Sequence, residues 1–176
     1  YFARATRTQW AWSTIQLHGR TIARARRDHA GRLCAVTLPG ERSVGFHYNA
    51  AGRISMIDLP AADNGGQKIH LRLAYSNRGH LLRATDEAGE TSSFSYKGVL
   101  MQTRTLPSGM TYRYRYDGEG PESKCIYTGG DDHRLERWLD YTDDGRTTFV
   151  RNRHDHVTTY HHNELGAVTK VVDCQG

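Results

Sequence analysis

Histidines near the carboxyl end of the chain are the residues whose types and spacing best suit metal binding. His154, His156, His161 and His162 fall within nine residues, and imidazole is a common ligand of zinc and other transition metals. His161 and His162 are chain neighbours, however, so they point to opposite faces of a strand. His154 and His156 fall where the chain is expected to bend between two strands. We therefore expect structural or solvent-exposed histidines, with no metal and no cofactor.

Carboxylates and thiols make a weaker case for catalysis. The Asp and Glu residues recur at the period of predicted turns, and turn chemistry explains them without an acid–base role. The three cysteines, Cys34, Cys125 and Cys174, lack the spacing of metal or redox motifs, and their odd number leaves at least one unpaired. Reduced, buried thiols are the expectation. The sequence therefore predicts a protein that is not an enzyme.

One repeated segment supplies the elements that position these side chains. A cassette of the form Tyr-Asp-x-x-Gly-Arg-Leu recurs with its glycine at intervals of 21, 27, 41, 25 and 21 residues, and a shortened copy divides the longest interval into 19 and 22. Such a period is the signature of a tandem repeat. The seven glycines are Gly31, Gly52, Gly79, Gly98, Gly120, Gly145 and Gly166.

Each cassette has the composition of a β-hairpin turn. Asp, Asn, Ser and Thr favour the first position of a type I turn because their side chains accept a backbone N–H, and glycine tolerates the positive φ at the fourth position. The opening residues are Asp28, Asn49, Ser76, Asp117, Thr142 and Asn163. We expect a hairpin tip at each cassette, with a tight turn of the primed kind in the shortened copy at Gly98.

The segments between the turns alternate as β-strands do. Tyr112, Tyr114 and Tyr116 alternate with arginines, which places three rings on one face and the charges on the other. No segment shows the 3.6-residue apolar spacing of an amphipathic helix. Tyrosine recurs four places before the glycine at Tyr48, Tyr75, Tyr116 and Tyr141, with Arg27 and His162 in its place in two copies. The sequence predicts an all-β array of stacked hairpins with almost no helix.

Composition and charge narrow the class of partner. No run of 18 apolar residues is present, so no membrane insertion is expected. Residues 1–33 carry seven arginines against a single acid, Asp28, while the remainder is close to neutral. A nucleic-acid site would place this charge beside exposed aromatics such as Trp10 and Trp12. We favour an arginine-rich strand face that limits aggregation, and no nucleic-acid partner.

With these residues in view, the cassette resembles the YD repeat of Rhs (rearrangement hotspot) proteins, at Tyr48–Ile54 and Tyr141–Arg146. The stretch Tyr114–Cys125, followed by Thr128–Asp131, is similar to the central core of bacterial Rhs proteins associated with type VI secretion. His156–Gly166 is similar to the repeat that follows that core. The resemblance covers about residues 18–176 and leaves residues 1–17 as an incomplete leading strand region.

The resemblance implies a spiral β-sheet that forms a hollow shell around a toxic C-terminal domain until delivery to a competitor cell. The implied partners are the remainder of the Rhs core, the enclosed toxin domain and components of a secretion spike. The implied location is synthesis in a bacterial cytoplasm followed by secretion or delivery. Family members cleave themselves beside an Asp-Pro-x-Gly-Leu segment, but Asp173–Gly176 has cysteine where proline is usual. No catalytic residue is therefore carried over.

A size estimate also favours a section of wall. Seven hairpins supply about 14 strands, which span about 67 Å at about 4.8 Å per strand, too little to close around a folded domain. The open edges of such a section are expected to pair with other copies. The alternatives are an enzyme, which would need a cleft with converging carboxylates, and a carbohydrate- or cell-surface-binding YD module. Exposed aromatics beside Asn and Asp would favour sugar binding, whereas aromatics buried between strands would favour the wall.

Overall fold

The computed structural model describes residues 2–4, 10–60 and 69–174. The chain divides into two compact units, residues 1–91 and 92–176. In the described ranges the regular elements are strands and two short 3-10 segments. The expected all-β fold is therefore confirmed. No helix among the described residues is long and apolar enough to cross a membrane.

The first unit contains a two-stranded sheet and a larger antiparallel sheet. The small sheet pairs β1 (Phe2–Arg4) with β2 (Trp10–Trp12). The larger sheet contains β3 (Thr14–Leu17), β4 (Arg20–Arg27), β5 (Leu33–Thr37), β6 (Ser43–Tyr48), β7 (Ile54–Leu59), β8 (Ile69–Tyr75) and β9 (Leu81–Thr85). A 3-10 segment, η1 (Pro39–Glu41), connects β5 to β6. Pairing of β3 with β4 begins at Thr14, four residues before the array boundary expected from the sequence.

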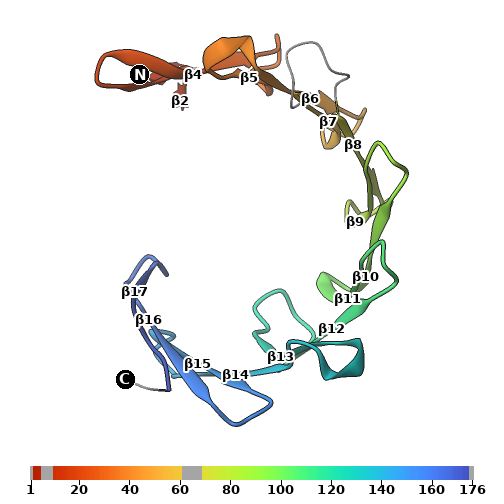
Figure 1. The fold of residues 1–176 in the computed structure, drawn as a ribbon, viewed down its shortest axis with the longest axis vertical. Coiled ribbons are helices and arrows are strands. Elements are labelled where there is room, and N and C mark those ends of the chain that lie inside the picture. The colour runs from red at the N-terminus through yellow and green to blue at the C-terminus, as the bar shows by residue number, and fades with distance from the viewer. Residues whose placement is uncertain (1, 5–9, 61–68, 175–176) are drawn as a thin grey trace. The chain divides into compact units, whose positions relative to one another are not determined.

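The second unit continues the same pattern. Its strands are β10 (Thr91–Lys97), β11 (Leu100–Thr105), β12 (Thr111–Tyr116), β13 (Cys125–Gly130), β14 (Arg137–Tyr141), β15 (Thr147–Asn152), β16 (Val157–His162) and β17 (Val168–Val172). A second 3-10 segment, η2 (Asp131–His133), connects β13 to β14. In each unit every strand of the larger sheet pairs antiparallel with its neighbours in the chain, as a curved single layer (Figure 1).

The strand order places the repeated turns at one end of each sheet. Because consecutive strands run in opposite directions, the cassette turns within a unit all lie at the same strand end, and the intervening turns lie at the other. We call the first the cassette end. The cassettes that recur along the sequence therefore form a row of turns along one end of each sheet.

The two faces of each sheet differ in chemistry. On β12, Tyr112 and Tyr114 are half-buried while Arg113 and Arg115 are exposed. We call the face that carries the cassette tyrosines the tyrosine face and the opposite one the charged face. Among the described residues four are buried, and none of them is a large side chain that is completely enclosed: Ala23, Ala35, Leu100 and Gly129. The described sheet thus has no second layer against either face.

The last strand of the second unit is an exposed edge. β17 pairs with β16 only, and its Val168 and Val171 are 52% and 53% exposed. An edge with free backbone groups and apolar side chains is a template for another strand. We expect this chain to associate as concentration rises, and a β17 variant with Val171→Lys to associate less. Sedimentation over a concentration series measures this, and a strictly monomeric wild type would contradict the open edge.

Candidate functional site

The cassette turns are closed by the side chain that opens them. In the turn after β6, Asn49 Oδ1 accepts a hydrogen bond of 3.0 Å from the Arg53 N–H, and the Gly52 N–H donates to the Asn49 carbonyl at 2.9 Å. Ser76 accepts from the His80 N–H at 3.1 Å in the same way, and Asn163 accepts from the Ala167 N–H at 2.9 Å. Each opening side chain therefore fixes both legs of its hairpin.

Six of the seven cassette glycines have a left-handed backbone. Their φ values lie between 60° and 89°, at Gly31, Gly52, Gly79, Gly98, Gly145 and Gly166. A side chain at such an angle is strained, which explains why glycine recurs there.

The prediction for Gly120 is wrong, because its φ is not positive. Its hairpin tip is a longer loop. The Asp117 N–H donates to the Lys124 carbonyl at 3.1 Å, and the Lys124 N–H donates back to Asp117 Oδ1 at 2.8 Å. Three more residues than in the turn at Asn49 separate the two legs of this hairpin, so the chain reverses without a left-handed φ at the glycine.

A β-bulge lies beside most of the cassette turns. Tyr48 is opposite Ile54 while His47 is opposite Met56, so Ser55 is an extra residue on β7. Equivalent register shifts precede Tyr75 and Tyr116. Such bulges increase the local twist and curvature of a sheet.

The β14–β15 hairpin has no bulge but a longer turn. Its Thr142 N–H donates to the carbonyl of Thr147, five residues on, whereas the turn at Asn49 closes on the fourth residue. The His162 N–H covers the carbonyl of the added residue, Arg146, at 2.8 Å. The extra residue has moved from the strand into the turn.

Neighbouring hairpins separate toward the cassette end. β5 and β6 pair only from Ala35–Gly45 to Thr37–Ser43, and β11 and β12 pair only from Thr103–Arg113 onward. At the cassette end the two strands of each of these pairs are no longer paired through their backbones. Another contact must connect adjacent hairpins there.

The cassette tyrosines make that contact. The hydroxyl of each donates to a backbone carbonyl at the start of the preceding strand, over 2.7–2.8 Å. The donor and acceptor pairs are Tyr48 and Leu33, Tyr75 and Ile54, Tyr116 and Met101, and Tyr141 and Cys125. Burial raises the pKa of the Tyr116 and Tyr141 hydroxyls, which keeps them protonated as donors. We call this repeated contact the tyrosine clasp.

Basic residues of one cassette cover the next. The Arg32 guanidinium lies 4.6 Å from the centre of the Tyr48 ring, and Lys124 Nζ lies 5.1 Å from that of Tyr141. The Arg53 guanidinium occupies the space over Gly79 in which a Cβ would clash. The arginine after the glycine in the cassette thus reaches the following hairpin. Sequence reasoning assigned it no role, although its recurrence was the available signal.

The two cassettes without tyrosine use other contacts. Arg27 donates to the Gly31 carbonyl of its own turn at 3.0 Å. His162 Nε2 lies 3.1 Å from the Thr148 hydroxyl on the preceding strand. The β15–β16 pairing reaches Thr147 and His161 at this end, so the His162 contact supplements a backbone ladder and does not bridge a gap.

The histidines considered for a metal do not converge. His154 and His156 lie in the turn between β15 and β16 with their ring centres 6.3 Å apart, and both are exposed. His161 Nδ1 lies 3.4 Å from the Thr147 hydroxyl, away from that turn. Among the described residues, no group of three His, Cys, Asp or Glu side chains has metal-binding geometry.

A different histidine cluster lies on the charged face of the first unit. Asp58 accepts from His47 Nε2 through one carboxylate oxygen and from His70 Nδ1 through the other, each at 2.8 Å. The cluster joins β6, β7 and β8. Gly45 lies opposite Asp58, where a Cβ would come within 3.3 Å of the carboxylate. The hydrogen bond from His47, and then that from His70, lowers the pKa of Asp58.

This cluster predicts a stability that depends on pH. A carboxyl whose pKa is lowered in the folded state stabilises the fold above its ordinary pKa, and this stabilisation disappears as the pH falls through the lowered value. Asp58→Asn should therefore cost about 1 kcal/mol at neutral pH and nothing in strong acid. Urea denaturation between about pH 2 and pH 7 measures the difference. Exposed Glu87→Gln is the control, and a cost for Asp58→Asn that is the same at every pH would contradict the assignment.

Aromatic residues on the charged face of the second unit are covered by arginines. The Arg115 guanidinium lies 4.2 Å from the centre of the Tyr127 ring, and that of Arg151 lies 5.3 Å from the Trp138 ring. Tyr127 and Trp138 contact each other edge to face at 5.6 Å. The rings thus form no open row of the kind that would favour sugar stacking.

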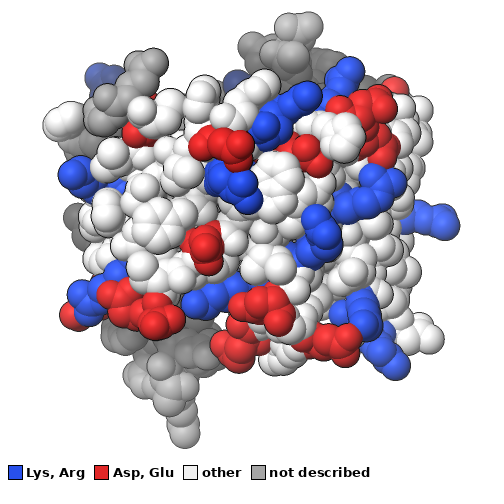
Figure 2. Space-filling model, turned by 90° about the horizontal axis from the view of Figure 1, so that it is seen from below, with Lys and Arg blue, Asp and Glu red and all other residues white. Residues whose placement is uncertain are grey.

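The described cysteines and acids show no catalytic arrangement. Cys34, Cys125 and Cys174 are all free thiols, and burial raises the pKa of Cys125, which disfavours the reactive thiolate. Cys34 and Cys125 are half-buried, but Cys174 is exposed, which contradicts the expectation of three buried thiols. On the face shown in Figure 2, acidic and basic side chains are interspersed.

Comparison with known proteins identifies the repeat. Residues 17–172 match the family described as Teneurin YD-shell. The chain belongs to this YD-shell family. The match covers the array of clasped hairpins, which agrees with the resemblance to YD repeats seen in the sequence. A search of curated proteins gave no match.

A solved structure supports the same fold. A chain in the crystal structure of TcdB2-TccC3-Cdc42 is similar to 86% of this YD-shell chain, with a TM-score of 0.54 and 17% sequence identity. The similarity covers 9% of that much longer chain. At this identity the likeness concerns the fold alone.

Proposed function

We propose that this YD-shell chain is a section of a hollow β-wall that encloses a protein cargo, a toxin domain, until delivery. The tyrosine clasp is the observation that carries the proposal. At four of the seven cassettes it connects a hairpin to the preceding one across the gap at the cassette end, which helps to hold together a sheet one layer thick without a covering layer. A wall needs this property, whereas a compact enzyme or binding domain does not.

The role we propose is structural rather than enzymatic. The opening side chains of the cassettes, Asp28, Asn49, Ser76, Asp117, Thr142 and Asn163, form hydrogen bonds that close turns, and the cassette tyrosines form bonds between strands. Both sets of repeated polar residues are therefore used by the fold. The family match and the similar fold of the solved toxin-complex structure support a scaffold.

The biological setting belongs to the same proposal. From the Rhs resemblance we infer a bacterial protein that is made in the cytoplasm and delivered to target cells by a secretion system of the type VI class. Its partners would be the rest of the shell, the enclosed toxin and components of the secretion spike. The carbohydrate- or cell-surface-binding alternative is not favoured, because arginines cover the Tyr127 and Trp138 rings.

Protease protection of the cargo tests the proposal. The complete protein that contains this chain should yield a cargo domain that resists a protease while the wall is intact. Paired substitutions in the clasp, Tyr116→Ala with Tyr141→Ala, should open the wall and expose the cargo to cleavage. A cargo that is cleaved at the same rate with and without the substitutions would contradict enclosure.

A further inference from the structure

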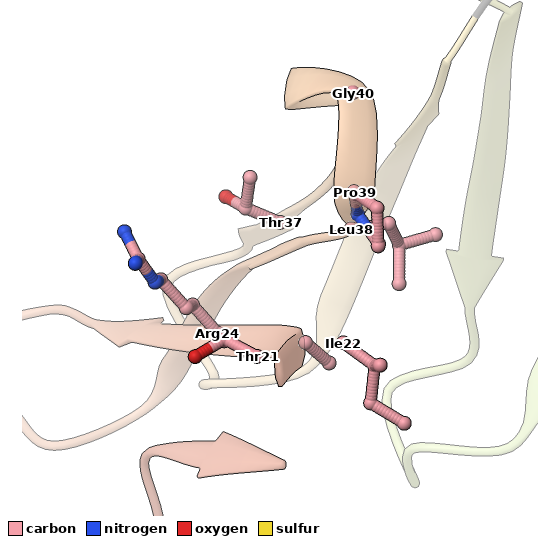
Figure 3. A pocket seen from close by; sticks show the side chains of 8 residues that line it. Thr21, Ile22, Arg24, Thr37, Leu38, Pro39 and Gly40 are labelled. Carbon is pink, nitrogen blue, oxygen red and sulfur yellow. The ribbon is translucent and has the colours of Figure 1, made fainter. Parts of the chain in front are cut away.

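A pocket of about 260 Å³ lies between β4, the end of β5 and the η1 segment of the first unit (Figure 3). Its charged group is Arg24, which lies directly opposite Thr37 in the β4–β5 pair. The Arg24 side chain is exposed. Leu38 and Pro39 form the side contributed by the turn. The pocket combines one cation, threonine hydroxyls and aliphatic carbon.

The cation of this pocket has no counter-ion within the described residues. Neither Arg24 nor Arg26, its neighbour on the same face of β4, forms an ion pair or hydrogen bond through its side chain there. Asp58 is the one acidic residue among the strands β3–β9, and both of its oxygens are taken by histidines. An unpaired guanidinium is a strong site for a carboxylate or phosphate, which it binds through two N–H groups.

The aliphatic side of the pocket restricts which anion fits. Ile22 and Leu38 are 37% and 39% exposed, and in Figure 3 their side chains lie away from the Arg24 guanidinium, with Pro39 beside them. A ligand that fills the pocket must therefore place methylene groups against these residues and an anion near Arg24. A glutamate side chain has this combination, whereas a bare phosphate group does not.

The spacing of Arg24 and Arg26 suits a ligand with two acidic side chains. Arg24 and Arg26 are two residues apart on a strand, or about 6.6 Å, which is also the distance between alternate side chains of an extended peptide. We propose that this part of the first unit binds an acidic polypeptide segment of the pattern Glu-x-Glu. One glutamate enters the pocket at Arg24, and the next pairs with Arg26.

Nucleic acid is a poorer fit for the same charges. Binding of single strands relies on aromatic side chains on which the bases stack, but the tyrosines that the structure describes in this unit, Tyr48 and Tyr75, bind backbone carbonyls on the opposite face. A nucleic-acid backbone also carries no flexible aliphatic side chain that could lie against the aliphatic side of the pocket. The acidic peptide uses both halves of the pocket, and the inference does not depend on the proposed shell function.

Fluorescence anisotropy with a labelled 12-residue peptide of alternating Glu and Ser tests the proposal. We expect binding that weakens at least about tenfold in Arg24→Gln, and also in Arg26→Gln. Arg83→Gln is the matched control, because Arg83 is also exposed on the charged face without a partner in the described chain. A peptide with Gln in place of Glu should not bind. Equal losses for Arg24→Gln and Arg83→Gln would overturn the site.

A second variant separates the peptide from other polyanions. Ile22→Ser keeps the charges but removes the aliphatic side, so it should weaken the Glu-Ser peptide several-fold and leave any binding of inorganic polyphosphate unchanged. Circular dichroism and thermal melting verify that each variant is folded. Tighter binding of polyphosphate than of the peptide, with no effect of Ile22→Ser, would contradict the assignment to an acidic polypeptide.

Discussion

Tyr116→Ala should lower the free energy of unfolding by about 2–4 kcal/mol, because it removes both a half-buried ring and a hydrogen bond between hairpins. The lost bond is the one from the Tyr116 hydroxyl to the Met101 carbonyl, at 2.8 Å. No backbone ladder replaces it, since the pairing of β11 with β12 stops at Thr103 and Arg113, before this end. Urea denaturation followed by circular dichroism measures the change.

Two phenylalanine variants separate the clasp from simple packing. Tyr116→Phe keeps the ring and should cost about 1 kcal/mol for the unpaired carbonyl. Tyr114→Phe is the matched control, because Tyr114 lies on the same face of the same strand and its hydroxyl has no hydrogen bond among the described residues. Equal costs for the two phenylalanine variants would show that the clasp does not stabilise the sheet.

Gly145→Val should destabilise the protein by about 1–3 kcal/mol, whereas Gly145→Asn should cost much less. Gly145 has a φ of 67°, and a Cβ built there would contact nothing within 4 Å. The penalty would therefore arise from the backbone angle and not from a clash. Valine is β-branched and disfavours this region strongly, while asparagine tolerates it.

Gly120→Val provides the control for that prediction. Gly120 occupies the same place in its cassette, its surroundings are equally open, and its φ is not positive. Its replacement by valine should change the melting temperature little. If the two valine variants were equally destabilised, the left-handed angle would not explain the recurrence of glycine.

The sequence was sufficient for the fold because its signals are local. A polar residue followed by glycine three places later determines a turn, and alternation determines a strand, so hairpins could be predicted without knowledge of their neighbours. The same rule failed at Gly120, where the longer loop from Asp117 to Lys124 reverses the chain without a positive φ at the glycine. The residues from Asp117 to Gly120 have the composition of a short turn, but the hydrogen bond that closes this hairpin is made four residues later, at Lys124.

Contacts between hairpins were harder to predict because they depend on register. The bond from Tyr48 to the carbonyl of Leu33 joins residues 15 apart, and Asp58 meets histidines 11 and 12 residues away on two different strands. A one-residue shift in pairing would move these side chains to the other face. The recurrence of tyrosine indicated a shared column, but its acceptor could be identified only from the pairing.

The turns at the opposite strand end were also less visible in the sequence. They vary in chemistry: the turn at Asp86 uses a carboxylate and Gly89, while the turn at Asn152 places Asp155 at a φ of 61°. No single cassette repeats there. A periodic sequence pattern reveals the turns at the end of the sheet where the same contact recurs. The turns at the other end share no pattern, so their conformations are seen only in the structure.

Electron cryo-microscopy of the complete protein that contains this chain is the most direct test of the central claim, that these clasped hairpins are a section of an enclosing wall. The account predicts that β3–β17 form part of a continuous β-shell, with the cassette tyrosines bound to the preceding strands and with cargo density inside. An open sheet with solvent against both faces and no enclosed density would contradict it.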